Sequence, residues 1–487
     1  MTLSREFWLS WRGALVVGVV LRLMAAWAGY GYFASDDYFH VVEPAWRWFT
    51  QPDAGIPSSY RTAVPAILVH ALMWLARGMG VDAPHHQLQV VYTVLGLFHC
   101  VAIPGAYLLA KPRLGVPVAN AAAWLMAAHA LLPRIGTRAM VEAMSQPFLL
   151  LGLAALQYAA DHPELRTRVR AGLLAGLILG TAVMLRLQLA TAAPGALLAL
   201  MLAMRSNVRG LLIITVAVTA GMVPPVVVQG LVDQAYLGQF LAYPARYVGF
   251  NVQHVEEYGL DPWHTYVGLL LAYSMPPTVL VLWRPLLATA RAHLLTTASL
   301  LTFLVVHSGV GHKEDRFIFP ALPLWLVLLA GMLVAGWSQG KLQRAAVVWF
   351  GVLNTALLML LIFSDEHRNA TTPLAETITM TPRPLVVGAG ELRLPALYAN
   401  GEQHILFRDT PDELVTQLQQ QPPPSALRWL ALTPPPEVLT RWLDTHGYRC
   451  GAPSNRPSGL LDQLLVLANP RNNPRRRPSV VVDCVLP

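Results

Sequence analysis

Apolar runs long enough to cross a lipid bilayer recur along the chain, and they constrain its fold more than any other feature. A transmembrane α-helix needs about 17–25 mainly apolar residues to cross a hydrocarbon layer of about 30 Å. Hydrophobic residues make up 55% of the 487 residues and charged residues 13%, whereas a soluble domain carries about 25% charged residues. The pattern therefore predicts a mainly α, polytopic membrane protein with about 11–12 transmembrane helices. The candidate spans are 13–31, 89–110, 117–133, 145–160, 171–187, 189–204, 209–229, 265–284, 289–307, 317–336 and 344–363.

Lysine and arginine residues gather in short clusters between these spans. The net charge of +8 is therefore not a sign of nucleic-acid binding. Because Lys and Arg mark cytoplasmic loops, the clusters place the N-terminus inside the cell. The segment Ala63–Leu75 is then an interfacial or re-entrant helix, or else a twelfth crossing. The outer face receives residues 32–61, 134–145, 230–264 and 307–316, and everything after Phe363.

Residues 366–487 differ from the rest of the chain in their pattern. Short apolar runs alternate with amphipathic helices that begin at N-cap residues, such as Thr410 before Pro411. This pattern predicts a small extracytoplasmic α/β domain at the C-terminus. Cys450 and Cys484 lie in it and can pair if the domain faces an oxidising compartment.

Two adjacent carboxylates, Asp36 and Asp37, follow the first span, and Glu43 lies further along the same expected interfacial helix. Neighbouring like charges at a membrane surface are costly, and they push one pKa upward. One interpretation is a general base at the boundary between water and lipid. The alternative is a pair of N-cap carboxylates on an interfacial helix.

Five ionisable residues in a row, from His312 to Arg316, stand directly before an apolar span. A charged side chain at the bilayer centre costs about 2.5–3.5 kcal/mol, so this run must form a polar mouth at the outer end of two spans. His312, Lys313 and Arg316 offer hydrogen-bond donors for a phosphate group, and Glu314 can position these cations or bind sugar hydroxyls. The alternative is a loop of charges that neutralise one another.

Two further outer segments carry candidate ligands. Arg138 and Glu142 have i,i+4 spacing, which predicts one helix face and fits either a surface ion pair or a ligand pair. Asn251, Tyr258 and Trp263 lie in one loop whose amide and aromatic groups suit a carbohydrate. Interfacial anchoring by the aromatic residues is the alternative. No spacing typical of metal ligands occurs.

Four motifs, in order along residues 1–365, resemble those of the polyprenyl- or dolichol-phosphate-mannose-dependent α-mannosyltransferases. This GT-C class family includes the enzymes that extend N-glycan precursors and GPI anchors. GHKEDRFIFPALP is similar to its His-Lys-Glu-x-Arg-Phe-x-x-Pro signature, and SDDYFHVVEP resembles its first-loop acidic pair. SYRTAVP, which contains Arg61, resembles its Arg-Ser/Thr element, and the segment from Asn251 to Tyr266 resembles its Tyr-Gly, Pro-Trp and Tyr pattern. The residues His40 and Asp37 depart from those usual in the family.

The resemblance implies a membrane glycosyltransferase whose catalytic domain is residues 1–365. Such an enzyme transfers mannose, or a related sugar, with inversion from a polyprenyl-phosphate-linked donor to a hydroxyl of an acceptor glycan or glycolipid. Asp36 or Asp37 is then the base. The implied donor-phosphate ligands are His312, Lys313, Arg316, Arg61 and Arg138, and the implied substrate ligands are Glu43, Glu142, Asn251, Tyr258, Trp263 and Glu314.

The resemblance implies no cofactor and no sugar nucleotide, because the polyprenyl-phosphate sugar is the donor substrate, and no spacing typical of metal ligands argues otherwise. The expected partners are this donor, the acceptor and the membrane, without nucleic acid. The Ala-, Arg- and Leu-rich composition with short loops resembles that of bacterial proteins. The expected location is therefore the inner membrane, with the site facing the periplasm. A polytopic transporter or lipid flippase is the rival interpretation, since such proteins also place charges at helix ends.

Overall fold

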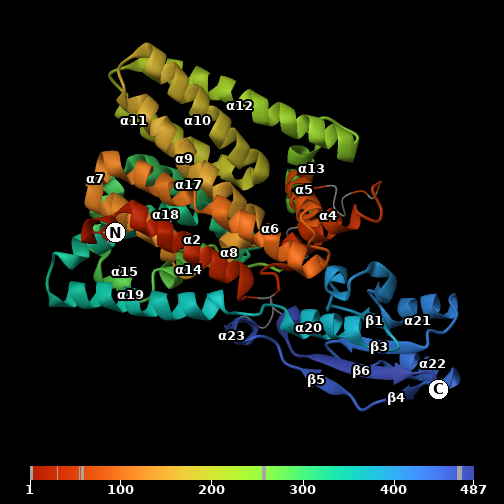
Figure 1. The fold of residues 1–487 in the computed structure, drawn as a ribbon. Helices are drawn as coiled ribbons and strands as arrows, with labels where there is room; N and C mark the ends of the chain where they lie inside the picture. The colour runs from red at the N-terminus through yellow and green to blue at the C-terminus, as the bar shows by residue number, and fades with distance from the viewer. Residues whose placement is uncertain (1–3, 30, 54, 56–59, 255–258, 469–473) are drawn as a thin grey trace. The chain divides into compact units, whose positions relative to one another are not determined.

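The computed structural model describes every residue except 1–3, 30, 54, 56–59, 255–258 and 469–473. The chain divides into two compact units, whose helices and strands are drawn in Figure 1. Unit 1 contains Met1–Ala26, Gly55–Leu68 and Tyr92–Met359. Unit 2 contains Trp27–Ala54, Val69–Val91 and Leu360–Pro487, so the segment expected to form the C-terminal domain shares a unit with much of the first outer loop.

Seven helices among the described residues are long and apolar enough to cross a membrane, or up to eight if a bent pair counts as one span. The bent pair is α16 (Trp283–Ala292) and α17 (Leu294–Gly309), which meet at 108°. The mainly helical, multi-span class predicted from the sequence is confirmed. The seven are α2 (Trp11–Trp27), α6 (Pro84–His99) continued by α7 (Ala102–Ala128), α9 (Val141–Asp161), α10 (Leu165–Leu185), α12 (Val208–Leu237), η3 (Asp315–Ala321) continued by α18 (Leu322–Trp337), and α19 (Lys341–Ile362).

Several expected spans are shorter or broken helices. The run 189–204 forms a 3-10 helix, η2 (Leu187–Ala192), followed by α11 (Ala193–Ala203). The run 265–284 is divided into α14 (Thr265–Tyr273) and α15 (Thr278–Val281) at Pro276 and Pro277, which lack the backbone N–H that a continuous helix needs. α5 (Val64–Gly78) has 15 residues, fewer than a full crossing requires. The remaining helices of unit 1 are α1 (Arg5–Leu9), α8 (Leu132–Thr137) and α13 (Ala242–Gln253).

α18 lies at the centre of unit 1. In the span that η3 and α18 form, 83% of the apolar stretch is buried, whereas in α12 only 17% is buried. α12 is therefore a peripheral helix, and it packs beside α10 (Figure 1). Glycines permit this close approach. A Cβ at Gly176 would lie 2.0 Å from the Val218 oxygen, and one at Gly221 would lie 2.1 Å from the Leu173 oxygen. Small residues at helix contacts are typical of membrane proteins.

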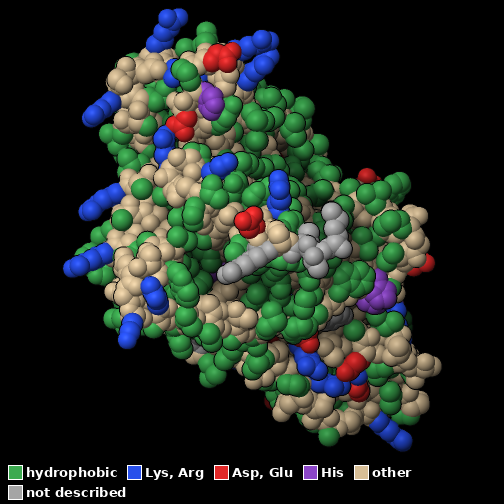
Figure 2. Space-filling model, turned by 60° about the vertical axis from the view of Figure 1, so that its left-hand side comes forward, with side chains coloured by type: hydrophobic (Ala, Val, Ile, Leu, Met, Phe, Trp, Pro, Cys, Tyr) green, Lys and Arg blue, Asp and Glu red, His purple; other side chains and the backbone are tan. Residues whose placement is uncertain are grey.

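Many apolar side chains are exposed on the protein, and Figure 2 shows one of its faces. Hydrophobic side chains cover much of it, and lysine and arginine side chains project along its left-hand edge and its top. Exposed apolar residues of α12 illustrate the pattern, because Leu212 is 60% exposed and Val216 is 68% exposed. Extended apolar surfaces of this kind are rare on soluble monomers.

Unit 2 contains a six-stranded sheet with the order β2-β1-β3-β6-β4, and β5 pairs with β6. β1, β2 and β3 are parallel, whereas β6 is antiparallel to β3, β4 and β5. Strands and helices alternate, which confirms the predicted α/β region. The strands are β1 (Leu385–Ala389), β2 (Ile405–Arg408), β3 (Ala426–Ala431), β4 (Arg449–Cys450), β5 (Ser454–Arg456) and β6 (Ser479–Val485).

The predicted N-cap is confirmed, because the Thr410 side chain accepts a hydrogen bond from the Glu413 N–H at the start of α21 (Pro411–Gln419). α21 and α22 (Glu437–Thr445) bury Leu414 and Leu439 against Trp429 of β3. The other helical segments of unit 2 are α3 (Ser35–Asp37), η1 (Tyr38–Val42), α4 (Glu43–Arg47), α20 (Arg368–Glu376), η4 (Thr377–Thr379), η5 (Ala396–Ala399), η6 (Glu402–His404), α23 (Leu460–Ala468) and η7 (Pro474–Arg476).

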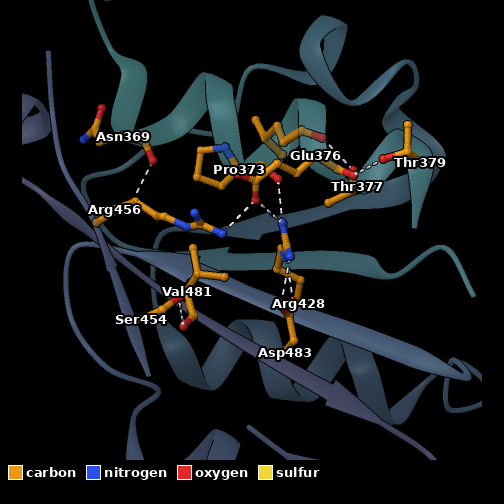
Figure 3. A network of polar contacts seen from close by, with 12 residues as sticks. Asn369, Pro373, Glu376, Thr377, Thr379, Arg428, Ser454, Arg456, Val481 and Asp483 are labelled. Atoms are coloured by element: carbon orange, nitrogen blue, oxygen red, sulfur yellow. Dashed lines mark hydrogen bonds and ion pairs between the residues drawn. The ribbon is translucent and has the colours of Figure 1, made fainter. Parts of the chain in front are cut away.

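Arg428 of β3 joins the sheet to α20 (Figure 3). Its buried guanidinium donates to both carboxylate oxygens of Asp483 on β6, at 2.6 and 2.8 Å. It also donates to the carbonyl oxygen of Pro373 at 2.8 Å and contacts Glu376, which receives Arg456 from the other side. Arg428 and Asp483 are partners in the strand register. This network explains how a charged residue is accommodated in a buried strand.

Cys450 and Cys484 form a disulfide between β4 and β6, where they are paired in the strand register. The bond closes a sequence separation of 34 residues. Cross-links of this kind stabilise a domain mainly by restricting its unfolded state. From the sequence we expected these cysteines to pair if the domain faces an oxidising compartment, and the structure contains the bond.

Candidate functional site

The charged run 312–316 folds on itself at the start of η3. Glu314 accepts hydrogen bonds from Arg316 Nε at 2.6 Å and Nη2 at 3.0 Å, and its Oε1 lies 3.2 Å from His312 Nε2. Arg316 is only 3% exposed. The arginine is therefore presented in one orientation by a bidentate carboxylate, and part of the run is self-neutralising.

Lys313 has a different environment from its neighbours. Its ammonium group donates to three backbone carbonyls, those of Val310 at 2.6 Å, Asp261 at 3.0 Å and Gly311 at 3.4 Å. Asp261 returns a backbone hydrogen bond to the Gly311 oxygen. An ammonium group has three donors, so in this structure Lys313 joins the loop around Gly311 to that around Asp261, which lies far away in sequence.

Arg186, which the sequence analysis did not select, lies in the same cluster. It follows α10 directly, is 5% exposed, and forms an ion pair of 2.7 Å with the buried carboxylate of Glu142. Its guanidinium carbon lies 5.6 Å from the ring centroid of Phe317, and that of Arg316 lies 5.3 Å from the same ring. Burial disfavours the charged guanidinium, but the attraction of Glu142 raises the pKa of Arg186. Two arginines with carboxylate partners thus share one aromatic ring.

Arg61 approaches this cluster through the segment that follows the first loop. Thr62 donates to Gln229 at 3.0 Å, and Gln229 donates to Asp233 at 2.7 Å. Asp233 in turn accepts the backbone N–H of Tyr243 at 2.8 Å. Burial raises the pKa of Tyr243, and the charges of Arg186 and Arg61 oppose this rise, so both arginines interact electrostatically with one phenol.

Arg138 does not share a helix with Glu142, which corrects the expected i,i+4 pair. The chain is extended at Arg138, which ends α8, and Glu142 is in the first turn of α9. Arg138 lies over the Tyr92 ring at 4.3 Å and points a nitrogen at the Ala25 oxygen, 3.4 Å away. Arg134 contacts the same oxygen at 3.3 Å. Carbonyls at a helix C-terminus attract cations, so these two arginines satisfy the end of α2.

A second unselected arginine, Arg22, lies inside the first span and is 1% exposed. It donates to the Met126 oxygen at 2.9 Å, at the C-terminal end of α7, and contacts His99 Nδ1 at 2.8 Å. His99 reaches Gln146, which donates to the Phe319 oxygen of η3 at 2.7 Å. Charged groups inside spans are rare and are usually satisfied by such contacts. This chain of hydrogen bonds links the first span to the segment that carries Arg316.

The two described candidates for carbohydrate ligands, Asn251 and Trp263, have different environments. Asn251 donates to the Tyr247 oxygen within α13 at 2.8 Å. Trp263 is 70% exposed and contacts His264 edge to face, which favours the alternative of interfacial anchoring. Tyr258 lies outside the described residues.

The acids of the first loop belong to unit 2. Asp36 and Asp37 lie in the short helix α3, where Asp37 is 3% exposed, and the backbone continues through the π-turn η1. Tyr38 stacks on Tyr32 with ring centroids 4.5 Å apart, and Tyr32 stacks on His367 at 4.3 Å. These rings position the backbone on both sides of the carboxylates.

The segment before the acids depends on a glycine. Gly31 has φ +86°, and a Cβ there would lie 1.8 Å from the Glu366 oxygen. Arg476 donates to the Phe33 oxygen at 2.5 Å and to Asp462 at 2.5 Å. The C-terminal part of unit 2 therefore holds the chain that leads to Asp36 and Asp37.

Glu43, the third acid of the first loop, begins α4 and is 8% exposed. Its nearer carboxylate oxygen is 4.0 Å from Arg47, one helical turn later. Among the residues the structure describes, no group of three or more His, Cys, Asp or Glu side chains has a geometry that can hold a metal ion.

Solved structures define the class of fold. The crystal structure of ArnT from Cupriavidus metallidurans bound to undecaprenyl phosphate matches with a TM-score of 0.62 at 13% identity, over 99% of this chain and 98% of that chain. The apo crystal structure of the Archaeoglobus fulgidus oligosaccharyltransferase matches with a TM-score of 0.53 at 10% identity, over 87% and 70%. The protein therefore has the fold of the GT-C membrane glycosyltransferases.

The chain belongs to the Alg9-like mannosyltransferase family, whose profile matches residues 14–381. GPI mannosyltransferase 3 of Gibberella zeae is 25% identical over 358 residues, which are 64% of this chain and 58% of that protein. GPI alpha-1,2-mannosyltransferase 3 of Danio rerio is 31% identical over 118 residues, which are 24% of this chain and 21% of that protein. The matched part is thus about a fifth of the zebrafish relative. The predicted family is confirmed.

Proposed function

We propose that the protein is an inverting glycosyltransferase that moves mannose, or a related sugar, from a polyprenyl-phosphate donor to a hydroxyl of a glycan or glycolipid. Family membership supports the sugar. The neighbour of similar fold that is bound to undecaprenyl phosphate supports the lipid-phosphate donor. The observation that carries the proposal is the pair of buried arginines, Arg186 and Arg316, around Phe317.

This pair suits the phosphate that leaves during transfer. Guanidinium groups bind phosphate oxygens in bidentate fashion, and preorganised positive charge is often the largest catalytic contribution where negative charge develops. Glu314 and Glu142 orient the two guanidinium groups before the donor arrives. Arg61 adds a third positive charge, while His312 contacts Glu314 and supports its orientation.

The attacking hydroxyl must lose a proton, and Asp36 or Asp37 is the proposed base. A carboxylate takes a hydroxyl proton best when it is held within hydrogen-bond reach. The contacts of Tyr32, Tyr38 and Gly31 support such positioning, because they restrain the backbone around α3. Inversion then follows from direct attack opposite the departing phosphate, with no covalent enzyme intermediate.

The proposed location is the inner membrane, with the acids and arginines on the periplasmic face. The disulfide between Cys450 and Cys484 supports an oxidising compartment for the C-terminal region. The alternation of basic clusters along the sequence supports the same face for the outer loops.

Purified protein in lipid nanodiscs, supplied with labelled polyprenyl-phosphate mannose and a mixture of mannosylated glycolipids, tests the proposal. We expect a labelled glycosidic product that is lost in Arg316→Ala. Movement of the labelled lipid between leaflets without a new glycosidic bond would instead establish a flippase and reject the transferase.

A further inference from the structure

Unit 2 contains a cavity of about 470 Å³ between the first loop and the C-terminal region. The first outer loop lines one side of it with Phe39 of η1 and with Glu43 and Arg47 of α4. The C-terminal region lines the other side with Arg393, Arg408 and Gln417. The wall at Arg408 is β2, the edge strand of the sheet. A space of this volume is large enough for one or two sugar rings.

The charged lining of this cavity consists of three arginines and the two carboxylates of Glu43 and Asp409. Glu43 lies 4.0 Å from Arg47, whereas Arg393 and Arg408 form no ion pair among the described residues. Arg408 donates to the Phe407 oxygen at 2.5 Å, and the Arg393 guanidinium lies 5.8 Å from the Phe39 ring centroid. Two guanidinium groups thus line the cavity without a carboxylate partner, which suits an anionic ligand.

Two other groups suit a sugar ring rather than a bare anion. Phe39 offers an aromatic ring, and carbohydrate C–H faces pack on such rings. Gln417 lines the cavity, and its buried side-chain oxygen has no hydrogen-bond partner among the described residues. A buried acceptor of this kind is costly when it is unsatisfied, and a sugar hydroxyl is a donor that can satisfy it.

We propose that this cavity is the acceptor subsite and that it takes a sugar carrying an anionic group, either a phosphate or a carboxylate. The proposal rests on the proposed transferase function and names the substrate class of its acceptor side. Phe39 and Glu43 follow Asp37 in one continuous helical segment. A ligand held against that segment is therefore bound by the same backbone that carries the proposed base.

Direct binding to the full chain in nanodiscs tests the subsite without donor or turnover. Saturation-transfer NMR would compare mannose 6-phosphate, glucuronic acid, mannose and inorganic phosphate. We expect one anionic sugar to bind at least 10-fold more tightly than mannose and than inorganic phosphate. Tighter binding of mannose 6-phosphate would show that the subsite takes a phosphate, and tighter binding of glucuronic acid would show that it takes a carboxylate. Equal binding of mannose and both anionic sugars, or binding of inorganic phosphate as tight as that of the better sugar, would overturn the proposal.

The variant Arg393→Gln/Arg408→Gln should weaken binding of that anionic sugar at least 10-fold. Arg441→Gln is the matched control, because Arg441 is an exposed arginine of α22 that pairs with Glu437, and it should bind as the unchanged protein does. Gln417→Leu should reduce binding of the anionic sugar to the level of inorganic phosphate. Unchanged affinity in the double variant would overturn the proposal. Because no transfer is measured, this failure is distinct from failure of the proposed transferase function.

Discussion

The arginines of unit 1 and the acids of unit 2 are held by different kinds of contact. In unit 1 the charged groups hold one another, as Glu314 does for Arg316 and Glu142 for Arg186. In unit 2 the ring stacking of Tyr38 on Tyr32 and the contact of Arg476 with the Phe33 oxygen act on the backbone beside Asp37. Substitutions that change charge should therefore have the largest effect on the arginines of unit 1. The acids of unit 2 should also be affected by distant substitutions that shift the backbone.

Removing a carboxylate of the first loop should have the largest effect. Asp36→Asn or Asp37→Asn should lower transfer about 100-fold or more, the usual size of a lost general base, while affinity for the lipid-phosphate donor stays near its original value. Product formation and donor binding are measured on the same nanodisc preparation. Near-normal turnover in both variants would remove these acids from the mechanism.

Substitution of the arginines of unit 1 should instead weaken binding of the lipid-phosphate donor. Arg316→Ala and Arg186→Gln should each weaken donor binding about 10-fold or more, since hydrogen bonds to charged groups contribute about 1.5–3 kcal/mol. Equilibrium binding of a polyprenyl phosphate measures this. Arg284→Gln is the control, because Arg284 is an exposed residue of α16. If Arg186→Gln binds donor normally, the role assigned to the Phe317 cluster is wrong.

The sequence predicted the fold class and the C-terminal α/β region, because hydropathy and strand patterns are local signals, and it predicted the family through short motifs such as GHKEDRFIFPALP. The assignment of Arg316 and Asp37 to outer segments stays a prediction. It did not predict that Lys313 would donate to three carbonyls, because one of these acceptors, Asp261, comes from another loop and leaves no mark in the sequence.

The sequence analysis did not select Arg186 or Arg22, although both occupy positions where a charged residue is unexpected. Arg186 lies at the end of the apolar run 171–187 that is predicted to face outward, where basic residues are not expected. Arg22 is a charged residue inside a span, where charge is costly and usually functional or satisfied. Arg393 and Arg408 of the cavity had no such signal, because only the folded sheet brings the end of β2 beside the loop that carries Arg393.

A substitution that shifts the backbone before the acids should have a smaller effect on turnover than removal of a carboxylate. Gly31→Ala places a Cβ within 1.8 Å of the Glu366 oxygen, so the backbone before the acids must shift. We expect kcat to fall on the order of 10-fold, since small misplacements of reacting groups are costly, with donor affinity unchanged.

Gly390→Ala is the matched control for this experiment. Gly390 has the same φ of +86°, but a Cβ there meets nothing within 4 Å. The two variants share the strain of a left-handed backbone and differ in the contact with Glu366. Equal kinetics in both would show that this contact does not position the acids.

The smallest expected effect concerns pH and His367, which packs on Tyr32 in the same part of unit 2. Burial, together with the charges of Arg476 and Arg475, holds the pKa of His367 well below its ordinary value. Below about pH 6.5 an unfolded histidine binds a proton that the folded one does not. Acid therefore favours the unfolded state, and stability is lost as pH falls below that value.

Asp462, which accepts the His367 backbone N–H at 2.7 Å, cannot mimic this loss. Burial raises the pKa of Asp462 against the opposing charge of Arg476, so on acidification its folded form takes up a proton first, which is stabilising. Melting temperature followed by scanning fluorimetry from pH 8 to pH 5 should thus fall less steeply in His367→Phe than in the unchanged protein. His446→Gln, at an exposed site that ends α22, should keep the original slope. Identical slopes in all three proteins would mean that the ring stack near the acids does not exclude the proton, and that the restraint on Asp37 is looser than the geometry implies.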